Sequence, residues 1–305
     1  MKAVRIHEYG DPEQLIYEDA PDPTLAADAV LIEAAAASVN PIDWKIRSGA
    51  RKKDFPLKLP AILGRDVSGI VRAVGLNIRT FKPGDRVMAF GEATYAELVA
   101  IEGAVLTHVP DGVDLIDAAA IPLAALTGEQ LVRLSVQAQR GQTLIVSGAL
   151  GSVGRAAVHT AKKLGAHVIA AVRGRQLAEA RALNVEDTLA VDDDSALAKL
   201  PAVDGVADTV GGEVAAKLFG KVKDGGHFGY ASVLPADVPQ TNPSVIVTRV
   251  FAKPDPSKVR EFADDVRDGK FTLPIGMRLP LREAARAHEL AQNGGVGKII
   301  LIARD

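Results

Sequence analysis

The chain has 305 residues, 48% hydrophobic and 24% charged, with a formal net charge of −2. This length exceeds what one hydrophobic core commonly supports, so we expect two domains. The small net charge, with no basic stripe of Lys and Arg, argues against nucleic-acid binding. The chain contains no cysteine, which excludes disulfides and thiolate metal sites. Its six histidines lack ligand-like spacing, so we expect no metal site.

Charges near the N-terminus, at Lys2, Arg5, Glu8 and Asp11, interrupt the apolar stretch that a secretory signal requires. No apolar run approaches the ~18 residues that a membrane helix requires. We therefore expect a cytoplasmic protein with no membrane association.

The first third of the chain, up to about residue 110, contains short β-rich runs separated by Gly and Pro turns. The runs lie at 29–33, 66–74, 86–90 and 95–101. The motif KPGDRV at 82–87 is a turn that leads into a strand, because Pro fixes φ and Gly tolerates positive φ. Short strands at this spacing predict an irregular barrel rather than a parallel sheet.

From about residue 115, apolar strands alternate with helical stretches, which is typical of a parallel sheet. The expected strands are 143–147, 167–172, 204–209, 227–230 and 245–251, and the expected helices are 152–164 and 213–222. After residue 254 a helix begins at Pro256 and stops at Gly269. A strand, a helix at 281–292 and a strand at 298–302 follow. These last elements are too few for a third domain, so we expect them to complete the first one.

The most informative stretch lies between the strand at 143–147 and the helix at 152–164. Gly148, Gly151 and Gly154 recur there at every third position. Glycines allow a tight turn and a close approach to a pyrophosphate, and the helix start offers free N–H groups and the positive end of its dipole. A strand before, a helix after and a second strand beyond favour a dinucleotide site over a simple turn. Ala149 and Leu150 replace the second glycine of the commonest fingerprint.

The end of the second strand bears on the choice of cofactor. Sites for NAD usually place Asp or Glu there, to accept hydrogen bonds from the ribose hydroxyls. This chain has Arg173-Gly174-Arg175 instead, and two guanidinium groups suit a 2′-phosphate. NADPH is the predicted cofactor; the alternative is that both arginines are solvated charges at a helix start. The run Asp192-Asp193-Asp194 is interpreted as a solvated turn.

Several motifs together resemble the medium-chain dehydrogenase/reductase superfamily, in its zinc-free quinone oxidoreductase branch, which includes zeta-crystallin and enone reductases. The resemblance covers nearly the whole chain. It rests on ASVNPIDWKIRSG (37–49), ILGRDVSGIVRAVG (62–75), FKPGDRV (81–87), TYAELV (94–99), LTGEQ (126–130), SGALGSVG (147–154), ADTVGG (207–212) and GKIIL (297–301).

The resemblance implies an α/β fold with two domains. A GroES-like irregular β-barrel catalytic domain would comprise residues 1–118 and 254–305, and a Rossmann dinucleotide-binding domain with a parallel sheet would comprise residues 119–253. The zinc branch carries a Gly-His-Glu motif where this chain has Gly64-Arg65-Asp66. This departure, with the absence of cysteine, implies a zinc-independent protein.

The resemblance also assigns roles to individual residues. Asn40 and Lys45, in the NPIDWK motif, are the expected polar catalytic residues, and Lys45 resembles a cofactor-contacting lysine of enone reductases. The other expected cofactor-binding residues are Thr127, Gly148, Ala149, Leu150, Gly151, Ser152, Val153, Gly154, Arg173, Arg175, Asp208, Thr209, Gly211, Tyr230 and Ala231.

The expected function is NADPH-dependent hydride transfer to a quinone or an α,β-unsaturated carbonyl. In such a reaction the protein orients the reactants, excludes water and donates toward the developing enolate oxygen. Two alternatives stay open: quinone reduction by single electrons, and a non-catalytic NADPH-binding or structural protein of the same fold. A small-molecule substrate and a homodimer, with the apolar segment 245–252 as an edge strand, complete the expectation.

Overall fold

The computed structural model describes residues 1–304, which form two compact units. The first unit contains residues 1–123 and the chain from residue 254 onward, and the second contains Ala124–Lys253. The unit boundary therefore lies between Leu123 and Ala124, inside a helix, whereas the sequence suggests residue 118.

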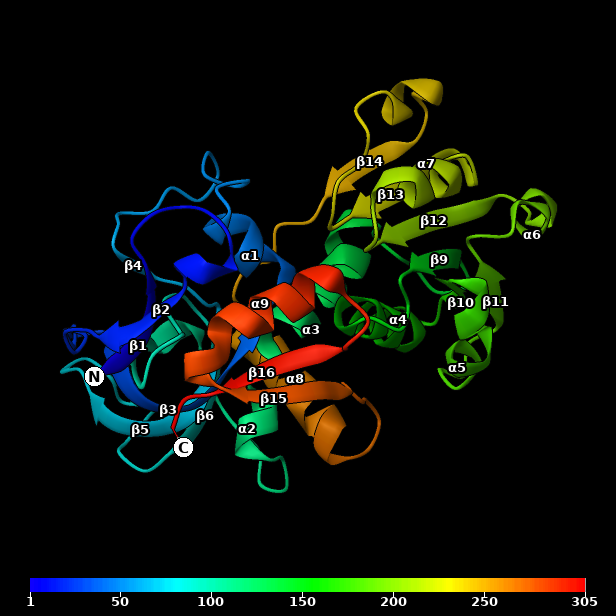
Figure 1. The fold of residues 1–305 in the computed structure, drawn as a ribbon. Helices are drawn as coiled ribbons and strands as arrows, with labels where there is room; N and C mark the ends of the chain where they lie inside the picture. The colour runs from blue at the N-terminus through cyan, green and yellow to red at the C-terminus, as the bar shows by residue number, and fades with distance from the viewer. Residues whose placement is uncertain (305) are drawn as a thin grey trace. The chain divides into compact units, whose positions relative to one another are not determined.

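The first unit is mainly β-structure (Figure 1). Its strands are β1 (Lys2–Ile6), β2 (Ile16–Asp19), β3 (Ala29–Val39), β4 (Ala61–Ile62), β5 (Asp66–Val74), β6 (Arg86–Phe90), β7 (Leu98–Glu102), β8 (Leu106–His108), β15 (Ile275–Pro280) and β16 (Lys298–Ile302). Its helices are α1 (Pro41–Arg47), α2 (Leu115–Ala118), α8 (Pro256–Arg267) and α9 (Ala284–Asn293).

A seven-stranded sheet organises this unit around the long strand β3. The order is β15-β16-β3-β5-β6-β8, with β7 also paired to β3, and a separate sheet has the order β2-β1-β4. Strand β16 pairs antiparallel with the end of β3, from Ile299 opposite Val39 to Ile302 opposite Ala36. The C-terminal segment therefore returns to complete the first unit, as the sequence predicts.

The second unit is a six-stranded, wholly parallel sheet with helices on both faces (Figure 1). Its strands are β9 (Thr143–Ser147), β10 (His167–Val172), β11 (Asp187–Ala190), β12 (Val203–Asp208), β13 (Val222–Tyr230) and β14 (Ile246–Arg249). Its helices are α3 (Pro122–Gln130), which begins just before the unit, a π-helical turn (Leu131–Ser135), α4 (Ser152–Leu164), α5 (Leu177–Arg181), α6 (Asp194–Lys199) and α7 (Gly212–Phe219).

The sheet order is β11-β10-β9-β12-β13-β14. Numbered from β9, this is the 3-2-1-4-5-6 order of a Rossmann fold, with its switch point between β9 and β12. Successive residues of β9 enter different cores: Leu144 and Val146 pack with α4, while Ile145 packs with α7. Because both faces are covered, the central strands are continuous apolar runs.

One helical stretch bears on the membrane prediction. The segment Leu115–Ser135 is long and apolar enough to cross a membrane by length and composition, so the prediction that no segment qualifies was wrong by that criterion. The same segment is 78% buried inside the structure, as the core helix of a soluble protein would be. It provides only weak evidence for a membrane span.

Candidate functional site

The glycine loop after β9 is shaped by steric necessity. Gly148 has φ of +59°, a conformation that disfavours side chains. A Cβ on Gly154 would lie 2.1 Å from the carbonyl oxygen of Gly148, far inside van der Waals contact. The Gly151 N–H donates to that same carbonyl at 2.9 Å. The loop therefore folds tightly against the first turn of α4, and only glycine fits at position 154.

The start of α4 lacks the groups that usually neutralise a helix N-terminus. Its N-cap, Gly151, provides no side-chain hydrogen bond, and no acidic residue lies in its first turn. The positive end of the dipole of a 13-residue helix thus has no anionic partner in its own first turn. This cradle fits a pyrophosphate, which would accept the N–H groups of the helix start.

The predicted residues of this loop differ in accessibility. Gly151 is exposed and Gly148, Leu150, Ser152 and Val153 are half-buried. Ala149 is fully buried in the α4 core. Ala149 therefore supports the loop from beneath.

Polar side chains brace the switch point between β9 and β12. The Asp208 carboxylate accepts the Ser147 hydroxyl at 2.6 Å and the Gly211 N–H at 2.9 Å. The Thr209 N–H donates to the Ser147 hydroxyl oxygen at 2.9 Å, and its own hydroxyl donates to the Ser147 carbonyl at 2.7 Å. Burial raises the pKa of Asp208. These bonds fix the loop after β12 beside the glycine loop.

The end of β13 lies at the same carboxyl edge of the parallel sheet as the loop after β12. Tyr230 lies opposite Asp208 in the β12–β13 ladder, and the Ala231 N–H donates to the Asp208 carbonyl at 2.9 Å. The structure thus gathers Gly148, Asp208, Gly211, Tyr230 and Ala231 along the carboxyl edge of the sheet, where ligands of open α/β folds bind. Thr127 is half-buried within α3.

Both predicted phosphate-binding arginines follow β10 at this edge. Arg173 and Arg175 are exposed, and neither guanidinium forms a hydrogen bond or ion pair with residues 1–304. Between them, the Gly174 N–H donates to Asp192 at 2.7 Å. The interpretation of residues 192–194 as a solvated turn was incomplete. Asp193 caps α6 and Asp194 pairs with Lys217 at 2.9 Å.

In the first unit, the predicted catalytic residue Asn40 lies in a buried polar network. Its amide oxygen accepts the Lys298 ammonium at 2.6 Å, and its amide nitrogen donates to Asp66 at 2.8 Å. Asp66 also accepts the Ser38 hydroxyl at 2.6 Å and the Leu123 N–H at 2.8 Å. Burial lowers the pKa of Lys298, and nearby Asp66 opposes that shift.

A second branch of the network begins at Asp43, in the first turn of α1. Asp43 accepts the Asn40 N–H at 2.8 Å and the Tyr95 hydroxyl at 3.1 Å. The Tyr95 oxygen lies 3.0 Å from Nε2 of His288, and Nδ1 of that ring is 3.3 Å from Arg47. Burial raises the pKa of Asp43 to about 7, and burial together with Arg47 lowers the pKa of His288 to about 3.

The two predicted catalytic residues of the NPIDWK motif, Asn40 and Lys45, have different surroundings. The side-chain nitrogen and oxygen of Asn40 both form hydrogen bonds with other residues of the protein. Lys45 is half-buried, with its ammonium 5.3 Å from the Trp44 ring centre. Sequence reasoning missed Ser38, Asp43 and Lys298 as partners of Asn40. The signal that pointed to a buried cation is that Lys298 is the first residue of the otherwise apolar strand at 298–302.

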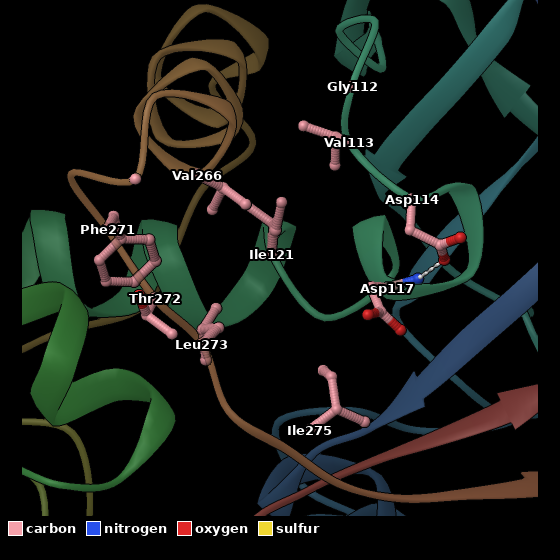
Figure 2. Close-up of a pocket in the computed structure, with 11 residues that line it drawn as sticks. Gly112, Val113, Asp114, Asp117, Ile121, Val266, Phe271, Thr272, Leu273 and Ile275 are labelled. Atoms are coloured by element: carbon pink, nitrogen blue, oxygen red, sulfur yellow. Dashed lines mark hydrogen bonds between the residues drawn. The ribbon is translucent and has the colours of Figure 1, made fainter.

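A hollow of about 250 Å³ lies elsewhere in the first unit, between α2, α8 and the start of β15 (Figure 2). Its wall is mostly apolar, with Val113, Ile121, Val266, Phe271, Leu273 and Ile275. Its carboxylates already have partners: Asp114 caps α2, and Asp117 binds Arg278 at 2.6 Å. The hollow therefore offers no free polar group from these two residues.

No group of three or more His, Asp or Glu side chains is placed to hold a metal ion within residues 1–304. At the position of the zinc branch's histidine, the Arg65 guanidinium stacks on Phe55, 4.7 Å from the ring centre. A guanidinium is a cation and no metal ligand.

Comparison with known proteins matches two stretches of the chain to family models. Residues 26–111 match the alcohol dehydrogenase GroES-like domain, and residues 183–301 match a zinc-binding dehydrogenase domain. A quinone oxidoreductase of Pseudomonas aeruginosa is 32% identical over 326 residues, covering 99% of this chain and 99% of the relative. The chain belongs to the quinone oxidoreductase family of the medium-chain dehydrogenase/reductase superfamily. The predicted resemblance is confirmed.

Solved structures of this superfamily have the same fold. The quinone oxidoreductase from Coxiella burnetii has a TM-score of 0.89 at 29% identity, covering 100% of this chain and 99% of that one. A mycobacterial protein complexed with NADPH has a TM-score of 0.83 at 26% identity, covering 99% and 100%. The predicted GroES-like and Rossmann architecture is confirmed, and the chain is an oxidoreductase of this family.

Proposed function

We propose that the protein binds NADPH and reduces a quinone or an α,β-unsaturated carbonyl by hydride transfer, without a metal ion. The observation that carries the proposal is the carboxyl edge of the parallel sheet. There a tight loop that admits only glycine at position 154, an uncapped helix start and two unpaired guanidinium groups come from consecutive strand–helix connections. Family membership supports the quinone as acceptor.

The preference for the phosphorylated cofactor rests on Arg173 and Arg175. Their guanidinium groups are exposed and form no ion pair within the described chain, so pairing with a 2′-phosphate disrupts no existing contact. No carboxylate directly follows β10 to accept a ribose hydroxyl. The NADPH complex of the mycobacterial relative agrees with this choice.

Bound NADPH would supply the hydride from its nicotinamide ring. The chain's own tasks are to hold the dinucleotide at the glycine loop, to keep the loop after β12 in place through Asp208, and to present polar groups from the NPIDWK motif. Because both amide atoms of Asn40 are engaged, we assign Asn40 a positioning role. Lys45, half-buried and cationic, is then the candidate donor toward a developing enolate oxygen.

The proposal is tested by NADPH oxidation with a panel of quinones and enones, alongside direct titration of both cofactors. We expect turnover with a member of the panel and tighter binding of NADPH than of NADH. Arg173→Ala with Arg175→Ala should weaken NADPH binding by about tenfold or more, because charge-assisted hydrogen bonds each contribute ~1.5–3 kcal/mol. NADH binding should stay unchanged. Equal affinity for both cofactors in the unmodified protein would contradict the choice of NADPH.

We also propose a cytoplasmic homodimer. The apolar character of β14 supports the dimer, because Ile246 is 48% exposed at an edge of the sheet. An exposed apolar edge strand is a template for pairing with a second chain.

A further inference from the structure

The turn between β10 and α5 carries both arginines, and a neighbouring strand holds it in place. Gly174 is two residues beyond the end of β10, and Asp192 is two residues beyond the end of β11. The two parallel strands are in register, with Val172 opposite Ala190, and the Val191 N–H extends the ladder to the Val172 carbonyl at 2.9 Å. The register therefore delivers the Asp192 carboxylate to the Gly174 N–H at 2.7 Å.

The other hydrogen bonds of this turn are local, and one of them runs from the Leu177 N–H to the Gly174 carbonyl. The Arg173 N–H donates to the Gln176 side chain at 3.3 Å, which is a long bond, and the Gln176 N–H donates to the Arg173 carbonyl at 2.8 Å. A Cβ built on Gly174 would find Asp192 as its nearest neighbour, at 3.4 Å. Glycine has more backbone freedom than any other residue, so a charge-assisted hydrogen bond to its N–H restricts the turn where it is most flexible.

We propose that Asp192 is a specificity-determining positioning residue, which orients the turn so that the guanidinium groups of Arg173 and Arg175 converge on the 2′-phosphate of NADPH. This inference rests on the proposed function. Asp192 has two opposing effects: its hydrogen bond orders the turn, and its negative charge lies near the site of another anion. The hydrogen bond is the dominant effect, and the two can be separated by mutation.

Two substitutions of Asp192 separate the effect of its hydrogen bond from the effect of its charge. Asp192→Asn and Asp192→Ala both remove the charge, but the asparagine amide oxygen still accepts the Gly174 N–H, whereas alanine has no acceptor. Asp194→Ala is the matched control, because it removes a neighbouring charge that pairs with Lys217 and not with the turn. The Kd values for NADPH and NADH are measured by fluorescence titration, with the Tm of each variant.

We expect the Kd for NADPH to be about fivefold higher in Asp192→Ala than in Asp192→Asn, from the ~2- to 10-fold worth of one hydrogen bond. The Kd for NADH should be equal in the two variants, and Asp194→Ala should keep the NADPH-to-NADH ratio of the unmodified protein. A purely structural role would shift both cofactors together.

Equal NADPH affinity of the alanine and asparagine variants, or a parallel shift for both cofactors, would overturn the inference. Failure of the proposed function looks different. In that case the unmodified protein shows no preference for NADPH, and replacing Arg173 and Arg175 changes nothing.

Discussion

Lys298 and Asp66 are buried charges whose nitrogen and oxygen atoms lie 3.7 Å apart, with Asn40 bonded to both. A buried charge is costly unless it is paired and hydrogen-bonded. Asn40 satisfies the ammonium with its oxygen and the carboxylate with its amide protons. Asn40 therefore has a structural role in the NPIDWK motif: it connects the start of α1 to Asp66 at the start of β5 and to Lys298 at the start of β16.

At the residue scale, the sequence predicted the place of the glycine loop between a strand and a helix but not the partners of Asn40. The glycine pattern is local, so the positions of Gly148, Gly151 and Gly154 between a strand and a helix sufficed. Lys298 lies 258 residues from Asn40, and such pairings depend on how β16 returns to β3. Asp192 was missed for the same reason, since its contact depends on the register of β11, a strand that the sequence did not predict.

Gly154 yields a residue-scale prediction. In Gly154→Ala, the new Cβ would lie 2.1 Å from the Gly148 carbonyl oxygen, so the loop or the helix start must move. We expect a loss of ~1–3 kcal/mol in stability, as for other overpacked sites. The Kd for NADPH should rise by about tenfold or more, because small misplacements of a binding group are costly.

The matched control is Gly220→Ala. Gly220 ends α7 with a helical φ of −64°, and its nearest neighbour to a new Cβ is 3.7 Å away. Its stability should change by less than about 0.5 kcal/mol, and calorimetry at low temperature should show unchanged NADPH binding. If Gly154→Ala bound NADPH like the control, the loop would not be the pyrophosphate cradle.

At the element scale, strands and helices with clear sequence boundaries were predicted closely. The predicted ranges for β5, β6, β9, α4, β10 and β16 match those of the structure. The strand predicted at 95–101 instead begins at Leu98, because the backbone at Tyr95 and Ala96 pairs with β1, through the Val4 N–H and an isolated bridge to Ala3, and not with β3. The helix predicted at 281–292 begins as a 3₁₀ turn, with α-helix only from Ala284.

Helix α1 carries a pH dependence opposite to ordinary acid denaturation. Burial raises the pKa of Asp43 to about 7 in the folded chain, compared with ~3.9 for an unperturbed carboxyl. Between these values the folded chain holds a proton that the unfolded chain has lost. The contribution of this group to stability is therefore largest at low pH and is lost as the pH rises toward 7.

His288, two hydrogen bonds from Asp43 through Tyr95, contributes in the opposite direction. Its pKa is lowered to about 3 by burial and by Arg47, so the unfolded chain binds the extra proton below ~6.5. Its contribution is lost as the pH falls from ~6.5 toward 3. From about pH 4 to 6.5 the opposite effects of Asp43 and His288 on the free energy of unfolding largely cancel.

Asp43→Asn removes the titrating carboxyl group but keeps a side-chain oxygen that accepts hydrogen bonds from Asn40 and Tyr95. Relative to the unmodified protein, the variant should gain unfolding free energy as the pH rises from 4 to 7. The upper limit of this gain is about 1.4 kcal/mol per pH unit. Urea unfolding across this range measures it, with Asp237→Asn, at an exposed carboxyl, as the control. Parallel pH curves for Asp43→Asn and the unmodified protein would show that Asp43 keeps an ordinary pKa.

At the scale of the whole molecule, the alternation of textures along the sequence predicted two domain types and the return of the C-terminus. The strand order of the parallel sheet, β11-β10-β9-β12-β13-β14, was not predicted, because β11 was missed and local sequence patterns do not say which strands are neighbours. The membrane criterion failed at this scale, since the buried helical stretch 115–135 is apolar for packing reasons that composition alone does not reveal.

The last prediction concerns assembly. Strand β14 pairs with β13 and ends the six-stranded order of the sheet, and Ile246 on it is 48% exposed. A two-fold axis beside β14 would pair it with its own copy, because an isologous contact places the same strand on both sides.

The substitution Ile246→Lys tests this pairing, because it places on the strand a charge of the kind that protects edge strands from pairing. We expect sedimentation to show a dimer for the unmodified protein and for the control Ile246→Val, and a monomer for Ile246→Lys at the same concentration. The Kd for NADPH should be equal in all three, since Ile246 begins its strand and the glycine loop lies at the opposite, carboxyl edge of the sheet. A dimer that persists in Ile246→Lys would place the interface elsewhere.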